Sequence, residues 1–289
     1  MGGQPGDALI INAAITGMVP MPERVPHVPV TPDQIVADAE RCVGAGASIL
    51  HLHARGGDGR PTWRREPYEE FVPAIRERCP EAVVCVTTSG RSVPDPEKRS
   101  AVLGLRGDAR PDMASLTLGS LNFRHEASIN PPELIERLAA RMRENNIKPE
   151  LEIFDTGMAQ LAETLLERDL LERPLYANLL LGGPNTAPAR PRDLVHLVES
   201  LPPDTVWAAG GFGRSQLTVN GLAAFMGGHV RTGLEDNPLY DWKLRTPATN
   251  SALVERVVRL ADLAGRTVST AQMTRRTLGV ATAQPAGSP

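Results

Sequence analysis

The stretch Ala47-Ser48-Ile49-Leu50-His51-Leu52-His53 begins as an apolar run and ends on two histidines that are two residues apart. In an extended strand, successive side chains alternate between the two faces, so both imidazoles leave the same face. Arg55 and a glycine-rich turn follow directly, which places the histidine pair at the carboxyl end of its strand. Folds built from α and β units place their chemistry at that end. The pair therefore predicts a divalent metal site, although a strand with two histidines bonded to the backbone would show the same short pattern.

Working outward, seven further β-branched or apolar runs alternate with amphipathic stretches that carry helix start and stop signals. The runs are Leu9–Thr16, Val83–Thr88, Met113–Leu118, Glu150–Asp155, Leu175–Leu181, Thr205–Ala209 and His229–Leu234. The helices are expected from Pro32 to about Gly44, Tyr68–Cys79, within Pro96–Arg106, from Asn130, Gly157–Arg168, Arg192–Leu201, Gln216–Met226 and Asn250–Ala264. About eight β–α units with short connections predict an α/β fold, a closed (β/α)8 TIM barrel.

This barrel is expected to form one domain over residues 1–280, and the small, polar tail 281–289 is expected to be disordered. A doubly wound open sheet is the alternative fold. It would normally carry a Gly-x-Gly-x-x-Gly turn after its first strand, and Ile15–Pro20 does not match that pattern.

Composition narrows the class of protein. The 289 residues carry a net charge of −3, which argues against nucleic acid as the main partner. No apolar run reaches the length of a membrane span, and the first residues lack the charged and apolar regions of a signal peptide. The three cysteines, Cys42, Cys79 and Cys85, are widely spaced and fit buried side chains in a reducing compartment. The expected location is the cytoplasm.

In a barrel, the carboxyl ends of the strands gather into one face, and here that face is rich in ligands, acids and small polar residues. It would collect Asn12, Thr16, His51, His53, Thr87–Arg91, Ser115, Thr117, Glu152, Asp155, Gly182–Asn185, Gly210–Arg214 and Glu235–Asn237. The first and last strands of a barrel are neighbours, so Glu235 is expected within reach of His51 and His53. Two histidines and a carboxylate suit zinc or ferrous iron. A solvated loop corner or a helix cap would also explain Glu235 and Asp236.

Glycine-rich turns follow three of the strands. Thr87-Thr88-Ser89-Gly90 fits an anion-binding nest or an ordinary strand end. The turns after the sixth and seventh strands contain Asn185, Gly213 and Arg214, at a place where barrels often bind phosphate groups. Exposed backbone N–H groups beside an arginine suit a nucleotide-like cofactor, but glycines used only for tight turns would look alike.

Taken in order, short motifs along nearly the whole chain resemble the β-keto acid cleavage enzyme family. They are Ala14-Ile15-Thr16-Gly17, Pro29-Val30-Thr31-Pro32, Ala45-Gly46-Ala47 with the histidine pair, Pro111-Asp112-Met113-Ala114, Gly119-Ser120-Leu121-Asn122-Phe123, Pro149-Glu150-Leu151-Glu152, and Gly227-Gly228-His229-Val230-Arg231 through Glu235-Asp236-Asn237. The resemblance implies a zinc-bearing (β/α)8 barrel, usually a homotetramer. It also implies that a β-keto acid and acetyl-CoA are converted into acetoacetate and a new acyl-CoA.

The resemblance also implies roles for single residues. The metal would be bound by His51, His53 and Glu235. The substrate proton would be abstracted by Asp236 together with Arg231 and the Thr87 hydroxyl, and Glu152 would be the second catalytic carboxylate. Ser115 and Gly90 would contact the substrate. Arg231 is expected to hold Asp236 ionised. We also predict substrate contacts for Thr88 and Thr117, and coenzyme contacts for Asn185, Gly213 and Arg214.

One position separates this chain from relatives that act on an amino-substituted substrate. Those relatives place a glutamate where this chain has Val19, and valine cannot pair with an ammonium group. A neutral or apolar keto acid is therefore expected, although Glu23 in the same loop could supply a replacement carboxylate. Two other functions fit the same residues: a metal-dependent aldol- or Claisen-type lyase acting on a CoA ester, and a binding protein without turnover. The intact Asp236 and Arg231 argue against the latter.

Overall fold

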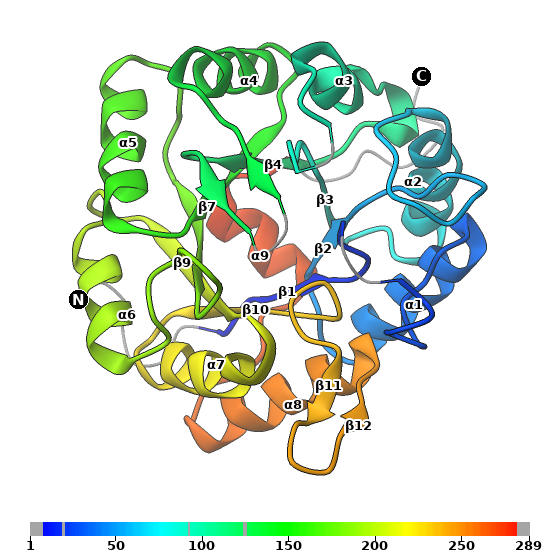
Figure 1. Cartoon of the computed structure of the whole chain (residues 1–289), viewed down its shortest axis with the longest axis vertical. Coiled ribbons are helices and arrows are strands. Elements are labelled where there is room, and N and C mark those ends of the chain that lie inside the picture. The colour runs from blue at the N-terminus through cyan, green and yellow to red at the C-terminus, as the bar shows by residue number, and fades with distance from the viewer. Residues whose placement is uncertain (1–7, 19–20, 92, 124–125, 282–289) are drawn as a thin grey trace.

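The computed structural model describes residues 8–18, 21–91, 93–123 and 126–281, and its centre is a closed barrel of parallel strands (Figure 1). The strands follow one another around the barrel in the order β1-β10-β9-β8-β7-β4-β3-β2. Their bounds are β1 (Ile11–Ala14), β2 (Ile49–Leu52), β3 (Val83–Val86), β4 (Met113–Thr117), β7 (Lys148–Ile153), β8 (Tyr176–Leu181), β9 (Val206–Gly211) and β10 (His229–Thr232). The predicted (β/α)8 barrel is confirmed, and the open-sheet alternative is wrong.

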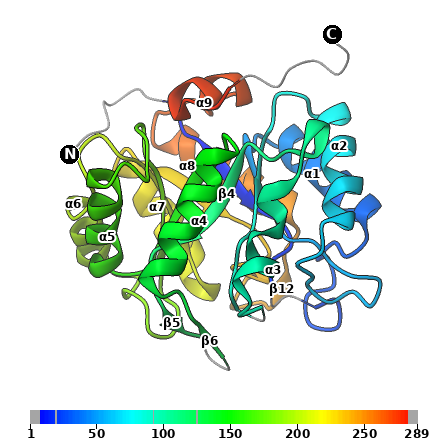
Figure 2. The ribbon, with the colours of Figure 1, turned by 90° about the horizontal axis from the view of Figure 1, so that it is seen from above.

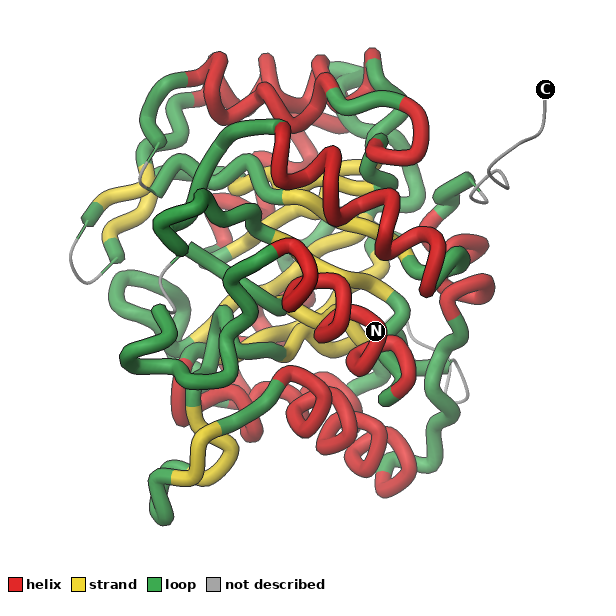
Figure 3. The backbone as a smooth tube through the Cα atoms, turned by 90° about the vertical axis from the view of Figure 1, so that its right-hand side faces the viewer, coloured by secondary structure: helices red, strands yellow, loops and turns green. Residues whose placement is uncertain are grey.

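Helices surround the barrel and cover the outer faces of its strands (Figure 3). They are α1 (Pro32–Gly44), α2 (Glu66–Arg78), α3 (Pro96–Ser100), α4 (Pro132–Glu144), α5 (Thr156–Glu167), α6 (Pro191–Glu199), α7 (Gln216–Phe225) and α8 (Asn250–Leu263). The start of α1 shows why the sequence signals were reliable. The Thr31 hydroxyl accepts a hydrogen bond from the Gln34 backbone N–H, and the Gln34 side chain bonds back to Thr31. Among the described residues, no helix is long and apolar enough to cross a membrane.

Strand pairing brings the two ends of the sequence together. β1 pairs in parallel with β2, where Ala14 lies opposite His51, and with β10, where Asn12 lies opposite Arg231. The segment that carries Glu235 follows β10, and only β1 lies between β10 and the strand of the histidine pair. This is the neighbourhood that the order of a closed barrel predicts.

Several elements were not expected from the sequence. Two short hairpins, β5 (Leu121–Asn122) with β6 (Ala127–Ser128) and β11 (Leu239–Asp241) with β12 (Thr246–Pro247), project from loops at the carboxyl ends of the strands. The segment expected to be one helix within Pro96–Arg106 is α3 followed by a 3₁₀ turn, η1 (Ala101–Gly104). A last helix, α9 (Ala271–Leu278), lies at the end of the barrel opposite to the hairpins (Figure 2).

Helix α9 closes the amino-terminal mouth of the barrel. Leu278 packs there against apolar side chains at the amino ends of the strands, among them Ile10, Ile49 and Met113. Arg275 is 1% exposed and forms a bidentate pair with Asp112, with N–O distances of 3.0 and 2.9 Å. Helix α9 thus packs onto the barrel, and the single domain over residues 1–280 stays a prediction. The predicted disordered tail, apart from Ala281, lies outside the described residues.

Candidate metal centre and active site

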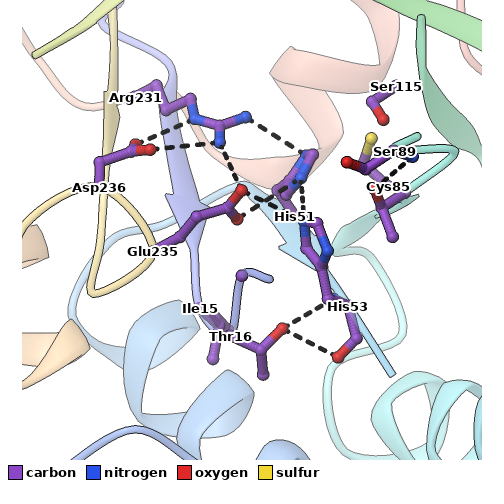
Figure 4. Close-up of polar contacts among 12 residues, drawn as sticks. Ile15, Thr16, His51, His53, Cys85, Ser89, Ser115, Arg231, Glu235 and Asp236 are labelled. Atoms are coloured by element: carbon purple, nitrogen blue, oxygen red, sulfur yellow. Dashed lines mark hydrogen bonds and ion pairs between the residues drawn. The ribbon is translucent and has the colours of Figure 1, made fainter. Parts of the chain in front are cut away.

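His51 in β2, His53 directly after it and the carboxylate of Glu235 after β10 meet at the carboxyl end of the barrel (Figure 4). The Nε2 atoms of His51 and His53 are 3.1 Å apart. Glu235 places one oxygen 3.2 Å from His53 Nε2 and the other 3.6 Å from His51 Nε2. The ligand atoms of the three residues all lie within 4.8 Å of one another. The predicted spatial grouping of His51, His53 and Glu235 is present.

These three residues fit a divalent metal ion. Both imidazoles are buried and point their Nε2 atoms at each other, and Glu235 Oε2 has no hydrogen-bond partner. Burial opposes protonation of His51, but the charges of Glu150 and Glu235 outweigh it and raise the pKa of His51 to about 9. Burial lowers the pKa of His53. The two Nε2 atoms are close enough to share a proton, and a metal that takes their lone pairs would replace it.

The loop after β1 leaves room for the carboxylate ligand. Gly17 has a φ of +70°, and a Cβ atom at this position would lie 2.6 Å from the Glu235 Cγ atom. Any larger residue would push Glu235 away from the histidines and would also strain the backbone. Arg55 holds the same loop, because its guanidinium donates to the carbonyl oxygens of Thr16 and Gly17.

Glu150 belongs to the site, and the sequence analysis did not assign it a role. It is completely buried, and its Oε2 atom lies 2.6 Å from His51 Nδ1 while its Oε1 accepts a bond from the Asn12 amide at 2.6 Å. Burial opposes its ionisation, yet the charge and hydrogen bond of His51 lower the pKa of Glu150 to about 2. The sequence could have predicted this role, because Glu150 lies two residues before Glu152 and the two side chains must therefore face the same side of β7.

Arg231 links the acids of the site. Its Nε atom lies 3.1 Å from Asp236 Oδ2, its Nη2 atom lies 3.1 Å from Glu235 Oε1, and its Nη1 atom lies 3.4 Å from Glu152 Oε1. Arg231 was expected to hold Asp236 ionised. It does lower the pKa of Asp236, but burial and the neighbouring charge of Glu235 outweigh it, so the net direction is upward. A carboxylate with a raised pKa is a stronger base.

Hydroxyl side chains line the β3 and β4 side of the site. Thr117 donates to Glu152 Oε2 at 2.7 Å. Thr88 donates its hydroxyl to the Ser115 carbonyl at 2.6 Å, and the Ser115 hydroxyl accepts the Thr88 backbone N–H at 3.1 Å. The Thr88 proton is therefore used to join the two strand ends. Whether these residues contact substrate stays a prediction.

Thr87 and Gly90 lie after β3. The Thr87 hydroxyl accepts the Ser89 backbone N–H at 3.0 Å, and no contact of Thr87 with Arg231 or Asp236 occurs among the described residues. A Cβ atom on Gly90 would lie 2.5 Å from the Arg99 guanidinium, so this glycine makes room for a buried arginine. Val19 lies outside the described residues, although its neighbour Met18 is within them.

The residues predicted to contact the coenzyme lie on the opposite side of the mouth. Asn185 is exposed after β8 and donates to the Asn122 carbonyl at 3.2 Å. Gly213 begins the 3₁₀ turn η3 (Gly213–Ser215), and its backbone N–H donates to the Asp236 carbonyl at 2.8 Å. Arg214 is exposed in the same turn.

Cys85 is the nearest thiol to the histidines. Its sulfur lies within 4.8 Å of ligand atoms of His51 and Glu150, which makes this trio a second possible ligand group. Burial, helped by Glu150, raises the pKa of the Cys85 thiol well above its usual range. A thiol that keeps its proton is a poor metal ligand. All three cysteines are buried and free, as the sequence suggested.

A buried cluster of histidines and carboxylates at the carboxyl end of a closed parallel barrel is the kind of site that (β/α)8 enzymes use. The chain belongs to the β-keto acid cleavage enzyme family, whose family model matches residues 8–280.

Two curated relatives cover almost the whole chain. The 3-keto-5-aminohexanoate cleavage enzyme of Acetoanaerobium sticklandii is 38% identical over 275 residues, which are 95% of this chain and 99% of that protein. The 3-oxoadipate:acetyl-CoA acetyltransferase of Cupriavidus necator is 38% identical over 274 residues, which are 94% of each chain. The apo structure of ObcA matches with a TM-score of 0.77 at 22% identity, over 88% of this chain and 66% of that one. At this identity the likeness supports the fold alone.

Proposed function

We propose that the chain catalyses the reaction of a β-keto acid with acetyl-CoA to give acetoacetate and a new acyl-CoA. The observation that carries the proposal is the Arg231–Asp236 pair, held 3.1 Å apart beside a three-residue metal-ligand group in a chain of this family. In this reaction, the bond between the methylene carbon of the keto acid and its keto carbon breaks, and the methylene carbon forms a bond to the acetyl carbonyl carbon. The sulfur of coenzyme A leaves the acetyl group and joins the released acyl group.

His51, His53 and Glu235 would hold the metal, which we propose to be zinc. The bound ion would polarise the keto oxygen and so acidify the carbon between the keto group and the carboxylate. Glu150 would orient His51 through the Nδ1 atom, because a carboxylate on the outer nitrogen of a ligating histidine fixes its tautomer.

Asp236 is the proposed base. Its carboxylate takes the proton from the methylene carbon, and Arg231 fixes its position through contacts of 3.1 and 3.4 Å. Glu152, held by Thr117 and facing Arg231, is the proposed second acid–base group. The backbone bond from Gly213 to the Asp236 carbonyl ties this base to the loop that would receive the coenzyme.

The coenzyme and the keto acid are proposed to approach from different sides. Asn185, Gly213 and Arg214 follow β8 and β9, and Arg214 is free to meet a phosphate group of acetyl-CoA. The keto acid would extend toward β4, which carries Ser115 and Thr117, and toward the loop after β3, which carries Thr88 and Gly90. We also propose that its distal end carries no ammonium group. The residues that line the pocket next to Met18 include no carboxylate, which supports this expectation from the described side of the pocket.

We further propose a homotetramer in the cytoplasm. Exposed apolar side chains on adjacent helices, Leu217 and Phe225 on α7 and Leu263 on α8, offer surface that a partner subunit could cover. The three buried free thiols are consistent with a reducing compartment.

The test is a panel of β-keto acids assayed for acetoacetate with and without acetyl-CoA, on purified protein of known metal content. We expect turnover that requires acetyl-CoA, and loss of both metal and turnover in His51→Ala. Release of acetyl-CoA without its consumption would instead identify a lyase. Full, tightly held metal in His51→Ala would contradict the ligand assignment.

A further inference from the structure

A second feature of the barrel mouth is an open pocket beside β3, on the side away from the β8 and β9 loops. The empty space in it, open solvent included, amounts to about 330 Å³. The lining begins at Met18 and includes Thr87, which is predicted to take part in the chemistry. It consists of Met18, Thr62, Trp63, Tyr68, Thr87, Thr88, Ser89, Val93, Lys98, Arg99 and Val102. The pocket thus lies beside Thr87 and Thr88, the two lining residues that are predicted to take part in the chemistry or in substrate binding.

The charges of this lining all have one sign. Lys98 and Arg99 contribute two cations, and none of the lining residues is acidic. Lys98 is exposed at the rim, where its ammonium lies 5.2 Å from the centre of the Trp63 ring. Among the described residues, no carboxylate lies within ion-pair distance of either cation.

Arg99 is the unusual member of the pair, because it is buried without a direct ion-pair partner among the described residues. The charge of Glu152 acts on it from beyond ion-pair distance. It is 3% exposed, and its guanidinium donates to the Thr88 carbonyl, the Ile129 carbonyl and the Asn130 side chain at 2.9, 3.0 and 2.6 Å. A guanidinium has five N–H donors, so the two not used in these bonds are available. Burial lowers the pKa of Arg99 to about 10, which still leaves the group charged at neutral pH.

The surrounding chain is shaped to keep Arg99 in place. Gly90 has no side chain where the Arg99 Nη1 atom lies, since a Cβ atom there would be 2.5 Å away. Asn130 is itself fixed, because its amide donates to the Gly119 carbonyl at 2.8 Å. A buried cation costs free energy unless an anion compensates it, and this position faces a pocket that a substrate can enter.

We propose that this pocket binds a carboxylate at the distal end of the keto acid, so that the substrate class is a dicarboxylic β-keto acid. The proposal rests on the function proposed above, and it replaces the neutral or apolar keto acid expected from Val19 with an anionic one. β3 lies on the opposite side of the barrel from β9 in the strand order. The distal carboxylate would therefore lie away from the coenzyme, and the released acyl-CoA would carry a free carboxylate.

The experiment compares three six-carbon substrates that differ only at the distal end: 3-oxoadipate, which is anionic, 3-oxohexanoate, which is neutral, and 5-amino-3-oxohexanoate, which is cationic. Acetoacetate is the common product, so one assay gives kcat/KM for each at saturating acetyl-CoA. We expect 3-oxoadipate to be preferred to 3-oxohexanoate by at least about tenfold, and the amino compound to be the poorest. Preference for 3-oxohexanoate would overturn the proposal, whereas failure of all three with acetyl-CoA would overturn the proposed function itself.

Variants at the rim test the cause of the preference. In Lys98→Gln the ratio of kcat/KM for 3-oxoadipate to that for 3-oxohexanoate should fall about fivefold, mostly through KM, and in Lys98→Glu it should fall further. Lys243→Gln and Lys243→Glu change the net charge equally at an exposed position and should leave the ratio unchanged. An unchanged ratio in both Lys98 variants would remove Lys98 from the binding site.

Arg99 is tested by a pair of variants. Arg99→Lys keeps the charge, whereas Arg99→Gln removes it, and both lose the bonds of the guanidinium. If charge recognition is the role of Arg99, the ratio should fall about tenfold or more in Arg99→Gln and be partly retained in Arg99→Lys. Equal loss of turnover on both substrates in both variants, with unchanged ratios, would show that Arg99 only supports the fold.

Discussion

Arg275 at the amino end of the barrel and Arg231 at the carboxyl end are both almost completely buried, and the two differ in what surrounds them. At the amino end, Arg275 pairs with one carboxylate, Asp112, and donates its remaining N–H groups to the carbonyls of Glu81, Ala82 and Ala281. At the carboxyl end, Arg231 has four carboxylates within 3.8 Å, from Glu150, Glu152, Glu235 and Asp236.

The difference separates a structural pair from a functional one. All five donors of Arg275 are satisfied and its charge is balanced, so nothing further is needed for stability. Around Arg231 the negative charges outnumber the positive ones, even when His51 is protonated. Such an excess is costly in a buried site, and a divalent cation at His51, His53 and Glu235 would offset it. Variants at the two ends should therefore affect different properties.

The largest effect is expected at the carboxyl end, for Asp236→Asn. The amide cannot accept the substrate proton, so kcat should fall by roughly 10²- to 10⁴-fold. Metal content and thermal midpoint should stay close to those of the parent protein, because the amide fills the same space. Steady-state kinetics with metal analysis provide the check. A variant with near-normal turnover would move the base elsewhere, with Glu152 as the first candidate.

At the amino end, Arg275→Met should act on stability alone. Removing Arg275 leaves Asp112 with Arg76, 3.3 Å away, as its remaining cationic partner among the described residues. Breaking a buried ion pair by removing one partner costs up to about 3–5 kcal/mol of unfolding free energy. Denaturant titration measures this loss, and Arg276→Met on the exposed face of α9 is the matched control. Metal binding by the folded variant should match that of the parent protein. A loss of metal affinity would mean that the two ends are not independent.

Glu150 is expected to affect metal binding more than turnover, since it contacts the metal ligand His51 but not the proposed substrate. Glu150→Gln keeps the shape but removes the charge that orients and polarises His51. The dissociation constant for zinc, measured by competition with a chromophoric chelator, should rise by about 10- to 100-fold. Glu144→Gln at the exposed end of α4 is the control. An unchanged dissociation constant would leave Glu150 a purely structural residue.

The smallest effect concerns pH and again the amino end. His229 accepts the Ile10 backbone N–H on its Nδ1 atom at 3.0 Å, and burial, with the nearby charge of Arg266, lowers the pKa of His229 to about 3. The unfolded chain binds this proton near pH 6.5 and the folded protein does not. Stability is therefore full above about pH 6.5 and should fall by up to roughly 1.4 kcal/mol per pH unit below it. In His229→Gln this slope should be shallower, and an equal slope in both proteins would refute the assignment.

The sequence predicted the barrel well because its signals are local. Three signals can be recognised within a few residues: the alternation of side chains between the two faces of a strand, a helix cap such as Thr31, and a proline at a helix start. The same alternation correctly joined His51 with His53, and the closed topology brought Glu235 to them. Helix α9 was missed although Thr270 caps its start and Gly279 ends it in the left-handed conformation, because its eight residues contain few apolar positions from which a helix can be predicted.

What could not be predicted depends on contacts between distant residues. The net direction of the Asp236 pKa results from burial and from two neighbours on the same loop and strand, which compete. The role of Glu150 requires knowing that β7 faces β2 across the barrel interior. The position of Arg99 depends on hydrogen bonds to Ile129 and Asn130, which lie on another loop. None of these relations has a local pattern.

The contact between Arg275 and Asp112 joins residues 163 positions apart. During synthesis, the strands β1 to β10 are complete before Arg275 is added to the chain. Until then the amino-terminal mouth of the barrel is open, and Asp112 lacks this partner. Closure of so long a loop is slow relative to local helix formation. Sealing by α9 is therefore expected to be a late step of folding, and until then the apolar residues at that mouth are exposed to other chains and to chaperones.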